Sequence, residues 1–318
     1  MVDQLSFSSL DYAAKKRRTK RDVFLAEMAA IVPWAALEAV IEPHYPKAGS
    51  KGGRPPMPLE TMLRVYFLQN WYALSDPMAE ETLYDSEAMR RFAGIELGDD
   101  RIPDETTILN FRHLLERHGL TEAIFAEVNA HLADKGITLR SGTLVDATII
   151  DAPSSTKNKA GARDPEMSST KKGNAWYFGM KAHVGVDADS GVVHSLDTST
   201  AKVHDSQVWD ELLHGGETSL WADKGYVSAE REAAFAGPGK VWGVMRKAPK
   251  GGPLHPIDAQ INRIIVMVRA KVEHPFRVIK RQFGHGKTRY RGLAKNRAQL
   301  FTLFALGNLF LVRRRLVA

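Results

Sequence analysis

The stretch TLVDATII, residues 143–150, places a single carboxylate inside a run of apolar and β-branched residues. Valine, isoleucine and threonine are enriched in strands, so the run predicts a short β-strand with Asp146 in its middle. A carboxylate among apolar neighbours is costly unless it is ion-paired, hydrogen-bonded or bound to a metal. The rest of the chain therefore has to supply a partner for Asp146, either a structural one or a functional one.

Further strands follow this one along the chain. The runs WYFGMKAHVGVDA and VVHSLDTSTA lie on either side of the turn sequence DADSG and predict a hairpin. SLWADKGY and KVWGVMRK predict two more short strands, and the first of them ends with an acid, Asp223, near a glycine. Together these runs predict a sheet that contains both acids.

Helices are expected around these strands. HDSQVWDELLHG and AEREAAFAG are each predicted to be a helix, and helices are expected to fill the rest of the chain. This order predicts an α/β domain over residues 139–318, with a mixed sheet flanked by helices, and is compatible with a ribonuclease-H-like core. Residues 151–175 contain almost no apolar side chains and predict a polar insertion loop.

The N-terminal part of the chain predicts helices without strands. Residues 1–46 are expected to form an arm and a helix, and residues 47–138 a helical domain that opens with a loop rich in glycine, proline and cations. Within it, DPMAEETLYDSEAMRRFAG begins with Asp76-Pro77 and ends with Gly94. These residues are typical of the start and the end of a helix, so one helix is expected here.

Composition excludes several classes of protein. The chain has no cysteine, which excludes disulfides and thiolate zinc sites. Its longest apolar run, Leu300 to Val312, is too short to span a bilayer and predicts a buried or amphipathic helix. The N-terminus has no apolar segment behind its basic cluster and does not resemble a secretory signal. A cytosolic protein without a membrane partner is therefore expected.

Positive charge is concentrated near the C-terminus. Residues 240–318 hold 18 Lys and Arg against 2 acidic residues, a net charge of +16, whereas residues 1–239 have a net charge of −9. A second basic run, Lys15 to Arg21, lies near the N-terminus. Such clustering favours a polyanionic partner, most commonly nucleic acid.

The densest basic stretch, residues 268–292, holds eight Lys and Arg but a single acid, Glu273. Arg269 and Arg277 lie four residues to either side of Glu273, and Lys280 lies seven residues beyond it, so a regular α-helix would place all four on one face. Two interpretations remain open from these residues alone. The stretch is either an ordinary solvated helix face or a set of phosphate-binding cations around a metal-binding glutamate.

Asp146, Asp223 and Glu273 together form a candidate metal site. Two strands and one helix can bring three carboxylates to one edge of a sheet, although each acid alone is equally well explained by a structural role. Convergent carboxylates suit Mg²⁺ or Mn²⁺, which prefer oxygen ligands. A pair of such ions can activate a water or a 3′-hydroxyl at a phosphodiester.

Long, ordered motifs extend over nearly the whole chain, from about Leu5 to Val312. In the C-terminal part they are GTLVDATII, SSTKNK, DPEM, KKGN, FGMKAHVGVDA, the pair His204-Asp205, ADKGY and RAKVEHPFRVIKRQFG. Upstream they are RPPMPLETMLRVYFLQNWYALSDPMAEETLYDS and IPDETTILNFRHLLE. These motifs resemble the transposases of bacterial insertion sequences, specifically the insertion sequence 5 family.

The resemblance implies an N-terminal all-helical domain that binds DNA, at residues 47–138, and a ribonuclease-H-like catalytic core with an Asp-Asp-Glu triad. By motif, Asp146 in VDAT is the first acid, Asp223 in ADKGY the second and Glu273 in RAKVEHPF the third. The implied cofactor is Mg²⁺ or Mn²⁺, held by these three carboxylates.

The same resemblance extends to the basic stretch, with one departure. The family's C-terminal pattern is a Tyr, an Arg, a Glu and a Lys at set gaps, and Arg269, Glu273 and Lys280 match it, whereas Val266 stands at the tyrosine position. The side chains expected to contact DNA are Arg269, Arg277, Lys280, Arg281, Lys287 and Arg289.

The implied function is that of a DNA transposase. Such an enzyme binds the terminal inverted repeats of its element, cleaves DNA and transfers the strand to target DNA, so a homodimer or larger assembly on DNA in the bacterial cytoplasm, at the nucleoid, is expected. Two alternatives remain: a ribonuclease-H-like nuclease without strand transfer, and a non-catalytic DNA-binding derivative. The presence of all three acids favours a catalyst over the derivative.

Overall fold

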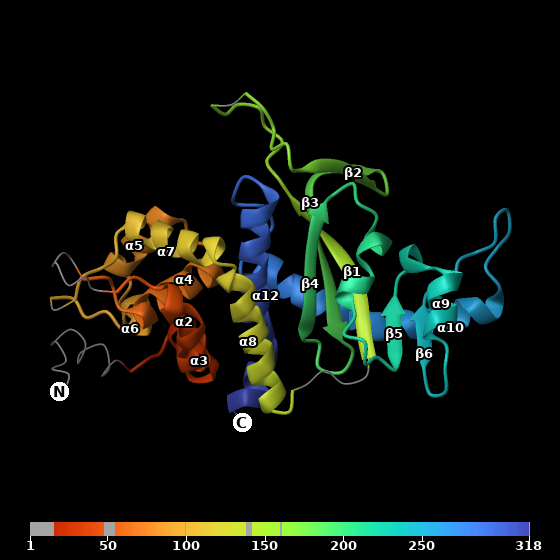
Figure 1. Ribbon diagram of the computed structural model, residues 1–318, viewed down its shortest axis with the longest axis horizontal. Helices are drawn as coiled ribbons and strands as arrows, with labels where there is room; N and C mark the ends of the chain where they lie inside the picture. The colour runs from red at the N-terminus through yellow and green to blue at the C-terminus, as the bar shows by residue number, and fades with distance from the viewer. Residues whose placement is uncertain (1–15, 48–54, 99, 138–141, 160, 318) are drawn as a thin grey trace. The chain divides into compact units, whose positions relative to one another are not determined.

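The computed structural model describes residues 16–47, 55–98, 100–137, 142–159 and 161–317 (Figure 1). The chain divides into two compact units, one formed by Met1–Val128 with Arg313–Ala318 and the other by Asn129–Val312. The boundary expected between residues 138 and 139 lies outside the described residues. So do Lys15, at the start of the first basic run, and most of the basic loop at residues 47–54.

The first unit is helical, as the sequence predicts. Its helices are α2 (Lys20–Ile31), α3 (Trp34–Ile41), α4 (Leu59–Tyr72), α5 (Asp76–Asp85), α6 (Glu87–Ala93) and α7 (Glu105–Arg117), and α8 (Leu120–Asp134) begins here and ends in the second unit. Thr19 and Asp22 form a reciprocal capping box at the start of α2, and Asp104 caps α7. Among the described residues, no single helix is both long and apolar enough to cross a membrane, and only the bent pair Lys20–Ile31 with Trp34–His44 meets that test when both are counted together.

The single helix expected between Asp76 and Gly94 is wrong, because two helices, α5 and α6, occupy this segment. Ser86 between them has extended backbone. Arg90 of α6 is buried and donates from Nη1 to the carbonyls of Leu83 and Tyr84, at 2.9 and 2.6 Å. The arginine therefore satisfies carbonyls at the end of α5 that a continuous helix would have paired within its own backbone.

The second unit contains the predicted mixed sheet. Its strands are β1 (Gly142–Asp151), β2 (Ser168–Lys172), β3 (Ala175–Asp187), β4 (Val193–Thr200), β5 (Ser219–Ala222) and β6 (Val241–Val244). β1, β3 and β4 are neighbours in antiparallel pairs, and β5 and β6 continue the sheet on the other side of β1 in parallel (Figure 1). This is the arrangement expected of a ribonuclease-H-like core, so the predicted fold class is confirmed.

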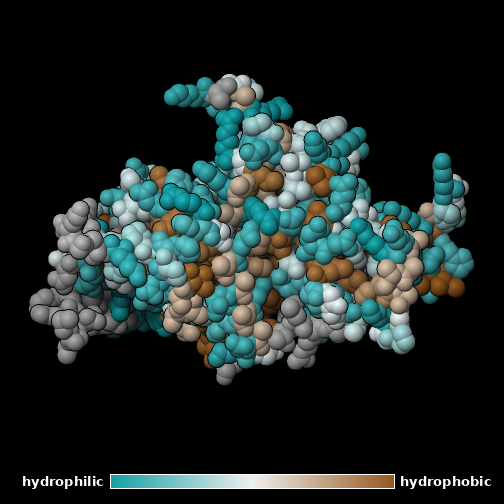
Figure 2. All heavy atoms as spheres, viewed as in Figure 1, coloured by the Kyte–Doolittle hydropathy of each residue, from teal (hydrophilic) through white to brown (hydrophobic). Residues whose placement is uncertain are grey.

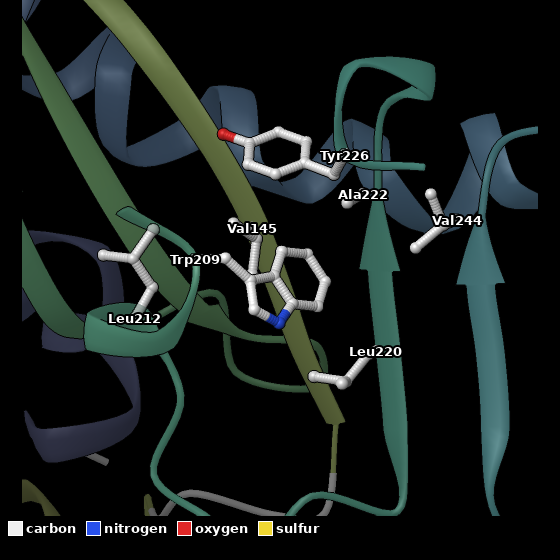
Figure 3. Close-up of a cluster of buried hydrophobic side chains, with 7 residues drawn as sticks. All are labelled: Val145, Trp209, Leu212, Leu220, Ala222, Tyr226 and Val244. Atoms are coloured by element: carbon white, nitrogen blue, oxygen red, sulfur yellow. The ribbon is translucent and has the colours of Figure 1, made fainter. Parts of the chain in front are cut away.

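One face of the parallel half of the sheet is covered by a compact apolar cluster (Figure 3). It consists of Val145, Trp209, Leu212, Leu220, Ala222, Tyr226 and Val244, all buried. Trp209 and Leu212 come from the segment between β4 and β5, which crosses over the sheet here. Burial of large aromatic and aliphatic side chains is the main source of stability for such a layer.

Three helical segments complete the second unit: α9 (Ala229–Phe235), α10 (Pro256–Arg269) with α11 (Glu273–Arg277), and α12 (Leu293–Val317). The run Leu300 to Val312 lies in α12 and is almost wholly buried, as expected. Asn308 of α12 accepts a hydrogen bond from the Val193 backbone N–H at 2.9 Å and donates one to the Val193 carbonyl at 2.7 Å. The buried amide thereby ties α12 to the start of β4.

The helix expected at HDSQVWDELLHG is wrong. The segment forms two short 3-10 turns instead, at Asp205–Val208 and Asp210–Leu212. Trp209 and Leu212 are both anchored in the apolar cluster, and His204 caps the first turn by accepting from the Ser206 N–H. Tertiary packing of these two side chains therefore outweighs the local preference for a continuous helix.

The polar segment 151–175, expected to be a loop, is partly a strand. β1 extends through Asp151, and Ser168–Lys172 forms β2, which pairs with the start of β3 across a turn where Gly173 has a φ of 61°. β2 has no buried side chain and is held by backbone pairing with β3 and by a hydrogen bond from the Lys202 N–H to Ser168 Oγ, so its polar sequence offers no apolar alternation to detect. Figure 2 shows the projecting part of this segment as mostly hydrophilic.

Candidate active site at the sheet edge

Asp146 lies in β1 with most of its side chain buried, at 19% exposure. Its Oδ1 accepts a hydrogen bond from the Ala147 N–H at 2.8 Å, and its Oδ2 accepts one from Arg269 Nη2 at 3.0 Å. Burial raises the pKa of Asp146, and the positive charge of Arg269 opposes that rise, while the negative charges of Glu273 and Asp223 add to it. The group that compensates the buried charge of Asp146 is therefore the guanidinium of Arg269.

Asp223 reaches the same edge through the sheet register. β1 and β5 run parallel and pair Val145 with Ala222, so Asp146 and Asp223 are the next residues on two neighbouring strands. The Asp223 carboxylate is 46% exposed, accepts from the Lys224 N–H at 2.6 Å, and lies 3.9 Å from Arg269 Nη1. Arg269 thus lies between the two aspartates and pairs with both.

Glu273 begins α11 and is exposed. It borders an open pocket of about 490 Å³, together with Thr148, His274, Phe276, Arg277, Lys280 and Arg281. A second open pocket, of about 650 Å³, has Asp223, Lys224 and Arg246 on its wall. Glu273 and Asp223 therefore border two different hollows that water and a ligand can enter, and Asp146 is not among the residues that line either of them.

The regular α-helix assumed between Arg269 and Lys280 is not present. α10 ends at Arg269, a 3-10 turn follows at Ala270–Val272, and a π-helical turn spans Val278–Gln282 after α11. The spacing of four and seven residues consequently does not place the four side chains on one regular face, because 3-10 and π turns change the rotation per residue. Arg269 instead turns to Asp146, whereas Glu273 and Arg277 face the pocket.

Lys280 is held against β1. Its Nζ donates to Thr148 Oγ1 at 2.7 Å and to the Ile149 carbonyl at 2.8 Å. Burial lowers the pKa of Lys280, with the charge of Asp151 acting in the opposite direction. This lysine therefore ties the helical segment to the strand that carries Asp146, in addition to lying on the wall of the pocket.

The other expected DNA contacts lie near the surface. Arg277, Arg281 and Lys287 are exposed, and the first two border the pocket beside Glu273. Arg289 borders a different pocket, of about 270 Å³, between the segment around Ser155 and the start of α12. Arg269 and Lys280 are half-buried, and the Arg269 side chain is 15% exposed.

The carboxylate oxygens of Asp146, Asp223 and Glu273 are the kind of ligand that a hard divalent cation such as Mg²⁺ prefers. Among the residues that the structure describes, however, no three His, Asp or Glu side chains are grouped closely enough to hold an ion as they stand. Arg269 supplies the positive charge between Asp146 and Asp223. Its Nε is buried without a hydrogen-bond partner in the described part of the chain, so the guanidinium is incompletely satisfied in this place.

Sequence reasoning missed Tyr226, whose hydroxyl is buried close to these acids. The residue was part of the quoted motif ADKGY, three positions after Asp223, but an aromatic residue at that distance carries no local sign of its burial. The bonds from Lys280 to β1 were also missed, because nothing in the sequence pairs two segments 132 residues apart.

Comparisons with known proteins identify the family. Residues 137–309 match the family described as the transposase DDE domain, and residues 13–114 match a second family, described as a transposase domain (DUF772). Among solved structures, the chain is similar to the cryo-EM structure of a piggyBac transposase synaptic complex with hairpin DNA, at a TM-score of 0.43 and 12% identity, over 94% of this chain and 76% of that chain. The narrower assignment to the insertion sequence 5 family stays a prediction. Because the first match covers more than half of its length, the chain belongs to the transposase DDE domain family and is a DNA transposase.

Proposed function

We propose that Asp146, Asp223 and Glu273 are the catalytic carboxylates of this transposase and that they act with Mg²⁺ or Mn²⁺. The observation that carries the proposal is that Asp146 and Asp223 directly follow the paired residues Val145 and Ala222 of two neighbouring parallel strands, with a cationic group between them. When bound, divalent ions would supply charge for activating a water or a 3′-hydroxyl and for stabilising the leaving oxygen. The side chains that would hold them are the three carboxylates.

The cations of this edge would bind and orient DNA. Arg269 pairs with Asp146, and a phosphate arriving at the site would offer it an alternative anionic partner, which would free Asp146 Oδ2. Arg277 and Arg281 border the pocket beside Glu273, where they are placed to contact the phosphates on either side of the scissile bond. This orientation would hold the phosphodiester over the carboxylates.

Recognition of the terminal inverted repeats is proposed for the helical unit, Met1–Val128. Its described basic residues include Lys16, Arg17 and Arg18, which are exposed and precede α2. Arg21 is less available, because its guanidinium lies over the Tyr72 ring, 5.3 Å from the centroid. Since two transposon ends have to be cut and joined, we further propose that the chain acts as a homodimer or larger assembly on DNA in the cytoplasm.

The proposal is tested with the purified chain and DNA that carries the inverted repeats flanking its gene. We expect cleavage at the repeat ends and joined strand-transfer products in Mg²⁺ or Mn²⁺, no product after chelation by EDTA, and weaker binding to a scrambled repeat. Metal-independent cleavage would contradict the proposed chemistry. Cleavage without any joined product would instead favour a nuclease, and binding without cleavage a non-catalytic derivative.

We expect the two lining cations Arg277 and Lys280 to respond differently to substitution. Arg277→Gln should weaken binding to all DNA sequences alike and flatten the log–log salt dependence of binding by about 0.9, the value for one phosphate contact on duplex DNA.

Lys280→Met should also lower the free energy of unfolding by about 1–3 kcal/mol, because Thr148 and the Ile149 carbonyl lose their buried donor. Binding titrations at several salt concentrations and denaturant unfolding measure both effects.

Arg314→Gln provides the matched control, since Arg314 is exposed in the last turn of α12. An unchanged salt slope for Arg277→Gln in a folded protein would show that the basic stretch is an ordinary solvated surface. Unaltered stability of Lys280→Met would show that its bonds to β1 contribute nothing.

A further inference from the structure

Tyr226 has a buried hydroxyl with no hydrogen-bond partner among the described residues. The side chain is 1% exposed, so solvent does not satisfy the hydroxyl either. An unpaired buried polar group is unfavourable, and a phenylalanine would fill the same space without that penalty. The presence of a tyrosine here therefore calls for a second state of the protein in which the hydroxyl has a partner.

The position of Tyr226 is fixed by the site itself. It ends the 3-10 turn Lys224–Tyr226, and its backbone N–H donates to the carbonyl of Asp223 at 3.0 Å. Its ring packs against the Trp209 indole, with 5.6 Å between the ring centroids, inside the cluster that includes Val145 of β1. In Figure 3 the hydroxyl points away from β5 and toward β1, the strand that carries Asp146.

The charges around the hydroxyl come from Asp205 and from three residues of the candidate active site, Asp146, Arg269 and Asp223. Burial raises the pKa of Tyr226, and the negative charges of Asp205 and Asp146 raise it further, whereas Arg269 acts in the opposite direction. A phenol in this place is therefore a hydrogen-bond donor at neutral pH. The carboxylates within electrostatic reach are those of Asp205, Asp146 and Asp223. Asp205 Oδ1 forms an ion pair with Lys181 at 2.8 Å but has no hydrogen bond among the described residues, so Asp205 is the competing acceptor that the test below has to separate from Asp146.

Asp146 is the candidate acceptor in the active site, because its Oδ2 is held by a charged side chain that a phosphate can attract. Both of its oxygens are engaged in the structure, Oδ1 by the Ala147 N–H and Oδ2 by Arg269. If Arg269 turns to a phosphate, Oδ2 loses its donor, and the orphaned hydroxyl of Tyr226 is the neighbouring neutral donor. A neutral hydroxyl does not compensate the negative charge of the carboxylate, so that charge stays available to a metal cation. The positive charge of an arginine compensates it.

We propose that Tyr226 is a positioning residue of the transposase site, whose hydroxyl donates to the Asp146 carboxylate in the DNA-bound state and fixes its orientation. This inference rests on the catalytic role proposed for Asp146. Groups that orient a metal-binding carboxylate contribute about 10–100-fold to metal affinity or activity when they are removed singly.

The test is Tyr226→Phe, which removes the hydroxyl and preserves the packed ring. In the free protein we expect a thermal midpoint that is unchanged or up to about 4 °C higher, because an unsatisfied group has been removed. On terminal-repeat DNA we expect cleavage to slow about 10–100-fold and Mn²⁺ to bind the protein–DNA complex more weakly by a similar factor. Calorimetric titration with Mn²⁺ measures the second effect independently of turnover.

Tyr45→Phe is the matched control, because the Tyr45 hydroxyl donates to the Met57 carbonyl at 2.8 Å. It should lower the thermal midpoint and leave Mn²⁺ affinity unchanged. Tyr226→Phe with wild-type cleavage and wild-type Mn²⁺ affinity would overturn the proposal, as would a thermal midpoint that falls like that of the control. The proposal would also fail if Tyr226→Phe slowed cleavage and weakened Mn²⁺ binding in the wild-type protein but not in Asp205→Asn. That result would identify Asp205, and not Asp146, as the acceptor of the Tyr226 hydroxyl.

Asp146→Asn, assayed in parallel, separates this inference from the proposed function. If Asp146→Asn still cleaves DNA, the catalytic role of Asp146 fails and the inference fails with it. If Asp146→Asn is inactive while Tyr226→Phe behaves as wild type, only the positioning role of Tyr226 fails.

Discussion

Asp146→Asn is expected to lower the cleavage rate by about 1,000-fold or more, equivalent to about 4 kcal/mol of transition-state stabilisation. The amide has nearly the shape of the carboxylate but lacks the negative charge that a divalent ion requires. DNA affinity should stay within about threefold of wild type, because most of it comes from phosphate contacts made by cations elsewhere. Single-turnover cleavage and binding titrations at one salt concentration measure the two quantities.

Asp189→Asn provides a control for the loss of one negative charge. Asp189 is exposed in the turn between β3 and β4, away from the edge where Asp146 and Asp223 lie. It should cleave at the wild-type rate. Cleavage by folded Asp146→Asn in Mg²⁺ at a rate close to wild type would remove Asp146 from the catalytic site.

Trp209→Ala is expected to reduce the free energy of unfolding by about 3–5 kcal/mol, the usual cost of deleting a fully buried large aromatic side chain. The indole is 2% exposed and lies beside Tyr226 in the apolar cluster (Figure 3). It also packs against Trp242 and Arg231, so the remaining side chains cannot easily close the space. Because Tyr226 ends the short turn that Asp223 caps, the edge of the site should loosen and cleavage should fall with stability. Denaturant unfolding followed by far-UV circular dichroism gives the free energy.

Trp176→Ala tests whether burial is the cause. Trp176 lies in β3 of the same sheet but is 71% exposed, so its removal should change stability by no more than about 0.5 kcal/mol. Equal losses for the two tryptophans would contradict the assignment of Trp209 to the core. A small loss for Trp209→Ala would show that the cluster can collapse around the missing indole.

Much of the fold was predictable from the sequence because it depends on local patterns. The β-branched run at 143–150, the hairpin around DADSG and the caps Thr19 and Asp104 all combine residues that are close along the chain. The family, too, follows from the order of such motifs. Local preference failed at the segment 204–215, where the buried side chain of Trp209 selects short turns over a helix.

The sequence by itself also determined which residues were candidates for the site, since Asp146 and Asp223 each stand out from their apolar strands. What joins them is the parallel register of Val145 with Ala222, a pairing between segments that no local pattern specifies.

Only the tertiary structure decided what each side chain contacts. Arg269 pairs with an aspartate 123 residues away, Lys280 bonds to a strand 132 residues away, and the Tyr226 hydroxyl has no hydrogen-bond partner among the residues that the structure describes. The physical reason is that propensity and periodicity act within a few residues, whereas ion pairs, buried donors and unsatisfied groups depend on which distant segments the folded core brings together.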